Sequence, residues 1–163
     1  EGPLTWQDKM RYFEGILESM WQARFLHRDL AHFLHQDAEL RRRYKVFVQD
    51  SLERGLVIYR SLRDSGLIEA SDEELRGLLV NTWVLAASWP GFTHGLNPDA
   101  TGDEALDRTL LRQGIYQIIC LEAPYLRGEA LDHLDAMKQE FRTGDTTMDL
   151  LFAAAEAPPA RRA

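Results

Sequence analysis

The chain has 163 residues, of which 45% are hydrophobic, and this is enough to bury one ordinary core without disulfides or a structural metal. Its formal net charge of −7 argues against a protein that grips nucleic acid by itself, because phosphate contacts need a clustered basic surface. No apolar run reaches the roughly 18 residues of a membrane span. We therefore expect a cytoplasmic protein that makes no membrane contact.

Two helical patterns open the chain. Thr5 is a good N-cap, and Asp8, three residues later, completes the reciprocal hydrogen bonds of a capping box. Apolar residues then recur at helical spacing to residue 21, and a second pattern covers residues 22–36. No strong breaker separates the two patterns, so they form either one bent helix or two.

The longest helix is expected over residues 38–65. Asp37 is a good cap for its first turn, and Gly66 fits the left-handed position that follows a helix. A basic cluster lies near its start among acidic residues, which favours a solvated helix face over a phosphate site. The cluster comprises Arg41, Arg42, Arg43 and Lys45.

The stretch over residues 72–89 is apolar nearly all round. A capping box formed by Ser71 and Glu74 opens it, and Pro90 closes it. A helix of this kind must be buried on two sides, and in a short chain we expect the second covering surface to come from another subunit. The pattern therefore predicts a homodimer. The narrow polar strip of the helix consists of Gly77, Asn81 and Ser88.

The remainder of the chain is also helical by pattern. After a loop rich in Gly, Pro, Asn and Asp over residues 91–103, helices are expected over residues 104–122 and 129–141. Gly114, inside the first of these, permits the close approach of a neighbouring helix. The predicted fold class is all-α, an orthogonal and antiparallel multi-helix bundle.

Nothing in the sequence supports an enzyme. It contains no glycine-rich phosphate loop, no GxSxG turn and no cysteine pair, and we expect no cofactor. Cys120 lies in an apolar run and is expected to be a buried core residue. Asp29, His32 and His35 share a helical face that could hold a metal ion, but the solvated side of an amphipathic helix explains them better, so we expect no metal site.

The aromatic residues are more informative than the charges. Many of them fall on the inward faces of consecutive helices, where they either pack the core or enclose a mainly apolar ligand cavity with a few polar anchors. For each single residue core packing is the stronger interpretation, and a pocket somewhere among them is the open alternative. The candidate ligand contacts are Trp21, Arg24, Phe25, Arg28, Phe33, Tyr44, Phe47, Tyr59 and Trp83.

Two segments carry a recognisable pattern. The first, residues 21–47, reads WQARFLHRDLAHFLHQDAELRRRYKVF, and the second, residues 61–92, reads SLRDSGLIEASDEELRGLLVNTWVLAASWPGF. Together they resemble the C-terminal ligand-binding and dimerisation domain of the TetR family of bacterial transcriptional regulators. The first has the aromatic, Arg-Asp-Leu and Asp-x-x-Leu pattern of a subset of these domains. The second resembles their passage from a long helix through Gly-Leu-Ile into an acidic-capped dimer helix.

This resemblance implies a homodimer held by a four-helix bundle, with two helices from each subunit. The matching helices here are residues 73–89 and 104–122, in agreement with the apolar character of the first. We expect the contacts between subunits to involve Leu75, Leu79, Trp83, Ala86, Leu110, Gly114, Ile118 and Leu121.

The resemblance also implies a ligand pocket among the preceding helices and a helix-turn-helix domain on the N-terminal side, which this chain lacks. Because the chain begins at Glu1 rather than a methionine, we interpret it as a piece of a longer protein. Residues 1–145 would form the helical ligand-binding and dimerisation domain, and residues 146–163 a short helix or a disordered tail.

The function that this implies is transcriptional regulation. A small, mainly apolar effector would bind this domain and modulate DNA binding, with operator DNA contacted only through the absent N-terminal domain. The alternative is a stand-alone dimeric helical module that binds a protein partner and has no role on DNA.

Overall fold

The computed structural model describes residues 4–96 and 104–142, except the side chains of residues 24–29 and 104–107. Over these ranges the chain is helical, apart from an isolated antiparallel bridge between Ile68 and Leu126, and the predicted all-α fold class is confirmed. The tail predicted over residues 146–163 lies outside the described residues. The elements are α1 (Trp6–Gln22), α2 (Arg24–Gln36), α3 (Ala38–Asp64), α4 (Asp72–Leu96), α5 (Glu104–Glu122), the 3-10 turn η2 (Ala123–Tyr125), α6 (Gly128–Asp132) and α7 (Leu134–Phe141).

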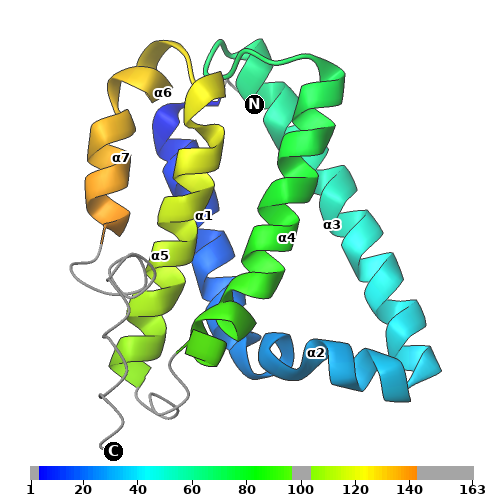
Figure 1. Ribbon diagram of the computed structural model, residues 1–163. Coiled ribbons are helices and arrows are strands. Elements are labelled where there is room, and N and C mark those ends of the chain that lie inside the picture. The colour runs from blue at the N-terminus through cyan, green and yellow to red at the C-terminus, as the bar shows by residue number, and fades with distance from the viewer. Residues whose placement is uncertain (1–3, 97–103, 143–163) are drawn as a thin grey trace, which may run out of the picture.

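The helices form a bundle with one crossing member. Figure 1 shows α1, α4 and α5 running roughly side by side, with α2 lying across their lower end and α3 rising from the far end of α2. Helix α5 packs against α1, α4 and α7, and α4 also packs against α2 and α3. Helix α4 is therefore shared between the bundle and an angular frame made by α2, α3 and α4.

The predicted starts of α1, α3 and α4 are confirmed, whereas the single helix predicted over residues 129–141 is two short helices, α6 and α7, that meet at His133. The Thr5 hydroxyl accepts a hydrogen bond from the Asp8 backbone N–H at 3.3 Å, and the Asp8 carboxylate accepts one from the Thr5 N–H at 2.9 Å. Asp37 accepts from two backbone N–H groups of the first turn of α3, both at 2.9 Å. Ser71 and Glu74 form the reciprocal pair at the start of α4. These side chains satisfy backbone donors that a first helical turn leaves free.

The first two helical patterns are two separate helices. They meet at Ala23, whose φ of −95° and ψ of 7° break the regular backbone and let α2 turn across the end of α1. Gly66 has the predicted left-handed conformation after α3, with φ of +74°. The chain then enters the core at once, because Leu67 and Ile68 are both buried.

The prediction that Pro90 closes its helix is wrong, because α4 continues through it. Proline inside a helix lacks an N–H and clashes with the preceding turn, at a cost of about 3 kcal/mol. Tertiary contacts offset this cost: Pro90 is buried, and the indole N–H of Trp89 donates to the Leu110 carbonyl at 2.7 Å. Residues 91–96 of the predicted loop are therefore helical, and residues 97–103 lie outside the described residues.

The core lies where α1, α3, α4 and α5 meet. Close approach there depends on Gly114, since a Cβ at this position would lie only 2.7 Å from the Trp89 ring, which confirms the predicted contact. Cys120 was expected in the core but is partly exposed. Fully buried apolar side chains include Phe13, Tyr59, Leu75, Ile115, Ile118, Leu126 and Met137.

Candidate functional site

Three of the predicted ligand contacts come together between α3 and α4. Phe47 packs edge-on against Trp83, with ring centroids 5.6 Å apart and planes at 62°, and Tyr44 lies 6.3 Å from Phe47. We name Tyr44, Phe47 and Trp83 the aromatic corner. Phe47 is 56% exposed, although a phenylalanine ring is normally among the most buried side chains. The corner therefore presents apolar ring surface that a ligand would cover.

The other predicted ligand contacts do not all join this corner. Phe33 lies on α2 and is exposed, with its ring edge against His32. Trp21 is half-buried beneath the guanidinium of Arg108, 4.2 Å from the ring centroid. Tyr59 is fully buried in the core. The side chains of Arg24, Phe25 and Arg28 lie outside the described set.

A buried polar cluster joins four helices. It consists of Lys9 from α1, Tyr59 from α3, Thr82 from α4 and Glu122 from α5, and we name it the Glu122 junction. Lys9 and Glu122 form an ion pair with side chains that are 1% and 0% exposed. The Tyr59 hydroxyl donates to the other oxygen of the Glu122 carboxylate and lies 3.4 Å from the Thr82 hydroxyl. The buried charges are therefore paired and hydrogen-bonded, as burial requires.

The phenols of Tyr59 and of Tyr12, which also feels the Glu122 charge, stay protonated at neutral pH. Burial raises the pKa of Tyr59 well above its usual value, and the nearby Glu122 charge raises it further. Burial, followed by the same carboxylate, raises the pKa of Tyr12 to about 12. Tyr59 is therefore a hydrogen-bond donor to Glu122 across the physiological pH range.

The junction escaped prediction, although a signal for it exists. Lys9 stands four residues before Phe13, and Glu122 stands four residues after Ile118, so each charge continues the apolar stripe of its helix. A charged residue on such a stripe is buried when its helix packs. Since a buried charge needs an opposite partner, the two positions could have been matched.

Helix α4 exposes one continuous face, which we name the outer stripe. It carries apolar side chains in the open, with Val80 47%, Val84 54% and Phe92 43% exposed. Within one chain α4 is therefore covered on one side only, and the predicted polar strip belongs to the uncovered side. The outer stripe comprises Gly77, Val80, Asn81, Val84, Ser88 and Phe92.

The residues predicted to contact a second subunit lie mostly inside the protomer. Within one chain their side chains pack against neighbouring helices, because the apolar side of α4 and α5 that they share is turned inward. The pairing of these two helices with a second copy stays a prediction, and the face of α4 that one chain leaves exposed is the outer stripe. Leu75, Leu79, Leu110, Gly114 and Ile118 are buried, and Trp83, Ala86 and Leu121 are partly exposed.

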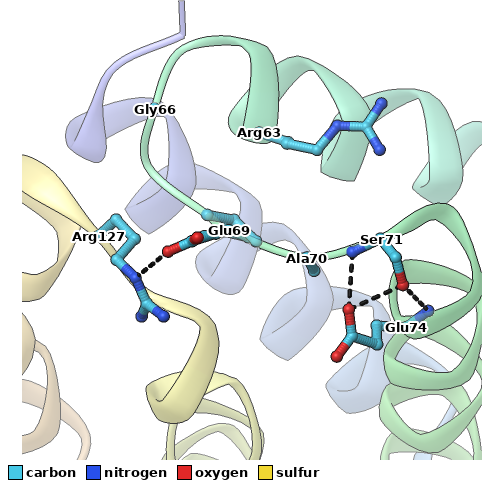
Figure 2. Close-up of a pocket in the computed structure, with 8 residues that line it drawn as sticks. Arg63, Gly66, Glu69, Ala70, Ser71, Glu74 and Arg127 are labelled. Carbon is cyan, nitrogen blue, oxygen red and sulfur yellow. Dashed lines mark hydrogen bonds and ion pairs between the residues drawn. The ribbon is translucent and has the colours of Figure 1, made fainter.

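A hollow of about 690 Å³ lies where the α3–α4 connection passes the turn before α6. Figure 2 shows Arg127 reaching across to Glu69, with Nε and Oε2 2.6 Å apart, and Glu74 turned to its cap partner Ser71. Arg63, also at the rim, pairs with the carboxylate of an α4 aspartate at 2.7 Å. Each charged side chain that lines the hollow already has a partner, so the hollow has no charge preference for an ion.

Two further expectations concern the surface. Arg42 and Arg43 both pair with Glu39 at 2.8 Å, which confirms the solvated helix face predicted for the basic cluster. His32 and His35 are exposed, and the described residues contain no group of three or more metal-ligating side chains. Among the described helices, none is long and apolar enough to cross a membrane.

Comparison with known proteins decides the family. A family model named TetR and described as a bacterial transcriptional repressor matches residues 1–134. The chain belongs to the TetR family. A crystal structure of a TetR-family transcriptional regulator from Marinobacter aquaeolei VT8 is similar, with a TM-score of 0.73 and 32% sequence identity. The match covers 88% of this TetR-family chain and 66% of the other.

The family model that matches this chain describes a class of bacterial transcription regulators. The chain spans just under two thirds of the length of the Marinobacter regulator, 66%. Among curated proteins no significant match was found.

Proposed function

We propose that this chain is the effector-binding and dimerisation part of a TetR-family transcriptional regulator. A small, mainly apolar effector would control DNA binding by an N-terminal helix-turn-helix domain outside this sequence. The observation that carries the effector site is the aromatic corner, where Phe47 is 56% exposed beside Trp83. Ring faces of this kind supply contact area, and the Tyr44 hydroxyl supplies a polar anchor.

The proposed mechanism is a shift between two arrangements of the helices. Because the aromatic corner bridges α3 and α4, an effector that fills it favours one separation of these helices over another. In a dimer, such a change would alter the spacing of two recognition helices that must sit about 34 Å apart on DNA. The net charge of −7 supports a division of labour in which DNA is contacted only by the other domain.

The proposed homodimer forms through the outer stripe. Its exposed valines offer apolar surface, while the small residues Gly77 and Ser88 allow a second helix to come close. Helix α5 packs beside α4, so the two helices of each subunit would build a four-helix bundle. A stable interface of this kind buries about 800 Å² on each partner.

The family match favours this regulator over a stand-alone interaction module with no role on DNA. We propose that it acts in the cytoplasm, where its operator DNA lies.

The effector site is tested with the full-length regulator and a DNA fragment of its own promoter. Small apolar compounds are screened for release of the DNA, and an active compound is then titrated against Phe47→Ala, Trp83→Ala and the control Val57→Ala. Val57 is exposed on α3 and is outside the aromatic corner. We expect the two corner variants to need about tenfold more compound and the control to behave as wild type. Equal release from all variants would refute the aromatic corner as the effector site.

A further inference from the structure

The Glu122 junction ties the start of α1 to the end of α5. Lys9 and Glu122 are 113 residues apart in sequence, yet their side chains form a fully buried ion pair. Replacing such a pair by apolar side chains of similar volume is often neutral or stabilising, whereas removing one partner is costly. The free energy of folding alone therefore explains the pair poorly. What the pair does supply is a defined position of α1 relative to α5.

That geometry is shared by four helices. The Lys9 ammonium lies 4.7 Å from the centroid of the Phe13 ring and 5.7 Å from that of Tyr59, which leaves it no route to water. Both oxygens of Glu122 are used, one by Lys9 and one by Tyr59, whose hydroxyl also approaches Thr82 of α4. A displacement of α1 along α5 would leave a buried charge without its partner, so the junction permits discrete positions of α1 rather than a continuous range.

The junction also lies between the two regions that the proposed function must connect. Thr82 precedes Trp83, a member of the aromatic corner, on the same helix. Lys9 belongs to the first turn of α1. Just before this helix, the backbone N–H of Leu4 donates to the Ser65 hydroxyl at 3.1 Å. Helix α1 is the first described helix of this chain, so in the proposed regulator it lies on the side of the N-terminal DNA-binding domain.

We propose that Lys9, Tyr59 and Glu122 are positioning residues that hold α1 in register against α3, α4 and α5 and thereby set operator affinity. This inference rests on the proposed function. The inference gives these three residues a role in DNA binding although they contact neither DNA nor effector. When the junction is lost, α1 samples several positions, and the two recognition helices of a dimer lose the fixed spacing that the operator requires.

The test uses the full-length regulator and its own promoter fragment at one salt concentration, without effector. The double variant Lys9→Met with Glu122→Leu removes both charges and keeps the volume. We expect it to melt at or above the wild-type temperature and to bind the promoter about tenfold more weakly, within the range typical of coupling between sites. Tyr59→Phe, which removes only the hydroxyl, should weaken binding by about threefold.

The matched control is the surface pair Glu69→Gln with Arg127→Gln, which also joins segments distant in sequence and should leave affinity unchanged. A folded double variant with wild-type affinity would overturn the inference, and so would wild-type affinity of Tyr59→Phe if the double variant does not fold. If wild-type protein fails to bind its promoter, the proposed function fails instead. Hydrogen exchange of the α1 amides then tests the inference. Exchange should be faster in the double variant than in the control, and equal rates would overturn the inference.

Discussion

The Glu122 junction and the aromatic corner are built on the same helices, α3 and α4, but in opposite ways. At the junction, polar and charged side chains are fully buried and each has a partner. At the corner, apolar rings stand partly in the open, with Phe47 56% exposed. At the junction α3 and α4 are therefore closed over by α1 and α5, whereas the corner is left with surface for a partner to cover.

This contrast shows where the molecule is rigid and where it can respond. The junction penalises displacement, because a shifted helix would leave a buried charge unpaired. At the corner, the binding of a ligand is favourable, because each Å² of apolar ring surface that is removed from water contributes about 25 cal/mol of free energy. A ligand at the corner would therefore change the arrangement of the helices there while the junction keeps its own contacts in place.

The largest expected effect concerns the outer stripe, which is exposed apolar surface like the corner. Replacing Val80 and Val84 together by glutamate should abolish the proposed dimer, because two charged side chains from each subunit would be buried at the interface. Sedimentation equilibrium should then give the monomer mass. The same double substitution at the exposed pair Val46 and Val57 of α3 is the control and should leave a dimer.

The next largest effect breaks the junction from one side only. Glu122→Leu leaves the Lys9 ammonium buried without a partner, so the free energy of unfolding should fall by about 3–5 kcal/mol. Adding Lys9→Met should restore most of this loss. Urea denaturation of the three proteins measures both changes, and an equal loss in the single and double variants would contradict the account of a paired buried charge.

Helix packing between α4 and α5 should be sensitive to a single methyl group. At Gly114 an added Cβ would lie 2.7 Å from Cδ1 of Trp89, so Gly114→Ala should cost about 1–3 kcal/mol of stability by overpacking. Gly15→Ala is the control, since no atom lies within 4 Å of its added Cβ and an exposed helical alanine should stabilise by about 0.5–1 kcal/mol. Thermal unfolding of both variants should give shifts of opposite sign.

The corner should contribute little to stability. Phe47→Ala is expected to cost about 1 kcal/mol or less, mainly its edge contact with Trp83, because more than half of the residue is already in water. Phe13→Ala, at a fully buried position, should cost about 3–5 kcal/mol. Similar losses at the two positions, measured by urea denaturation, would show that Phe47 is a core residue.

The smallest effect is a pH dependence at the start of α4. Hydrogen bonds from Arg60 and Arg63 lower the pKa of Asp72 to about 2, whereas an unfolded aspartate titrates near 3.9. The ionised carboxylate therefore stabilises the fold above about pH 4, and this contribution is lost as pH falls toward 2. Melting temperatures measured between these values should fall less in Asp72→Asn than in wild type. An unchanged pH profile in that variant would contradict the assignment.

Part of the candidate site could be predicted from the sequence, and the residues that were not predicted show what helical periodicity cannot record. The aromatic corner was predicted in part, because Tyr44, Phe47 and Trp83 all fall on apolar helical stripes. Tyr59 falls on the same kind of stripe, yet it lies in the core, since α3 diverges from the bundle along its length and periodicity does not record where. The narrow polar strip of α4 did mark the side that one chain leaves uncovered, because Gly77, Asn81 and Ser88 are all exposed.

The sequence by itself determined the starts of α1, α3 and α4, the left-handed turn at Gly66 and the all-α fold class, because caps and turns are hydrogen bonds within a few residues. Only the tertiary structure decided that α4 continues through Pro90 and that Lys9 meets Glu122. These outcomes depend on helices that are distant in sequence and adjacent in space. At Pro90, burial offsets the local cost of a proline inside a helix. At Lys9 and Glu122, burial of a charge creates a cost that only a partner distant in sequence can offset.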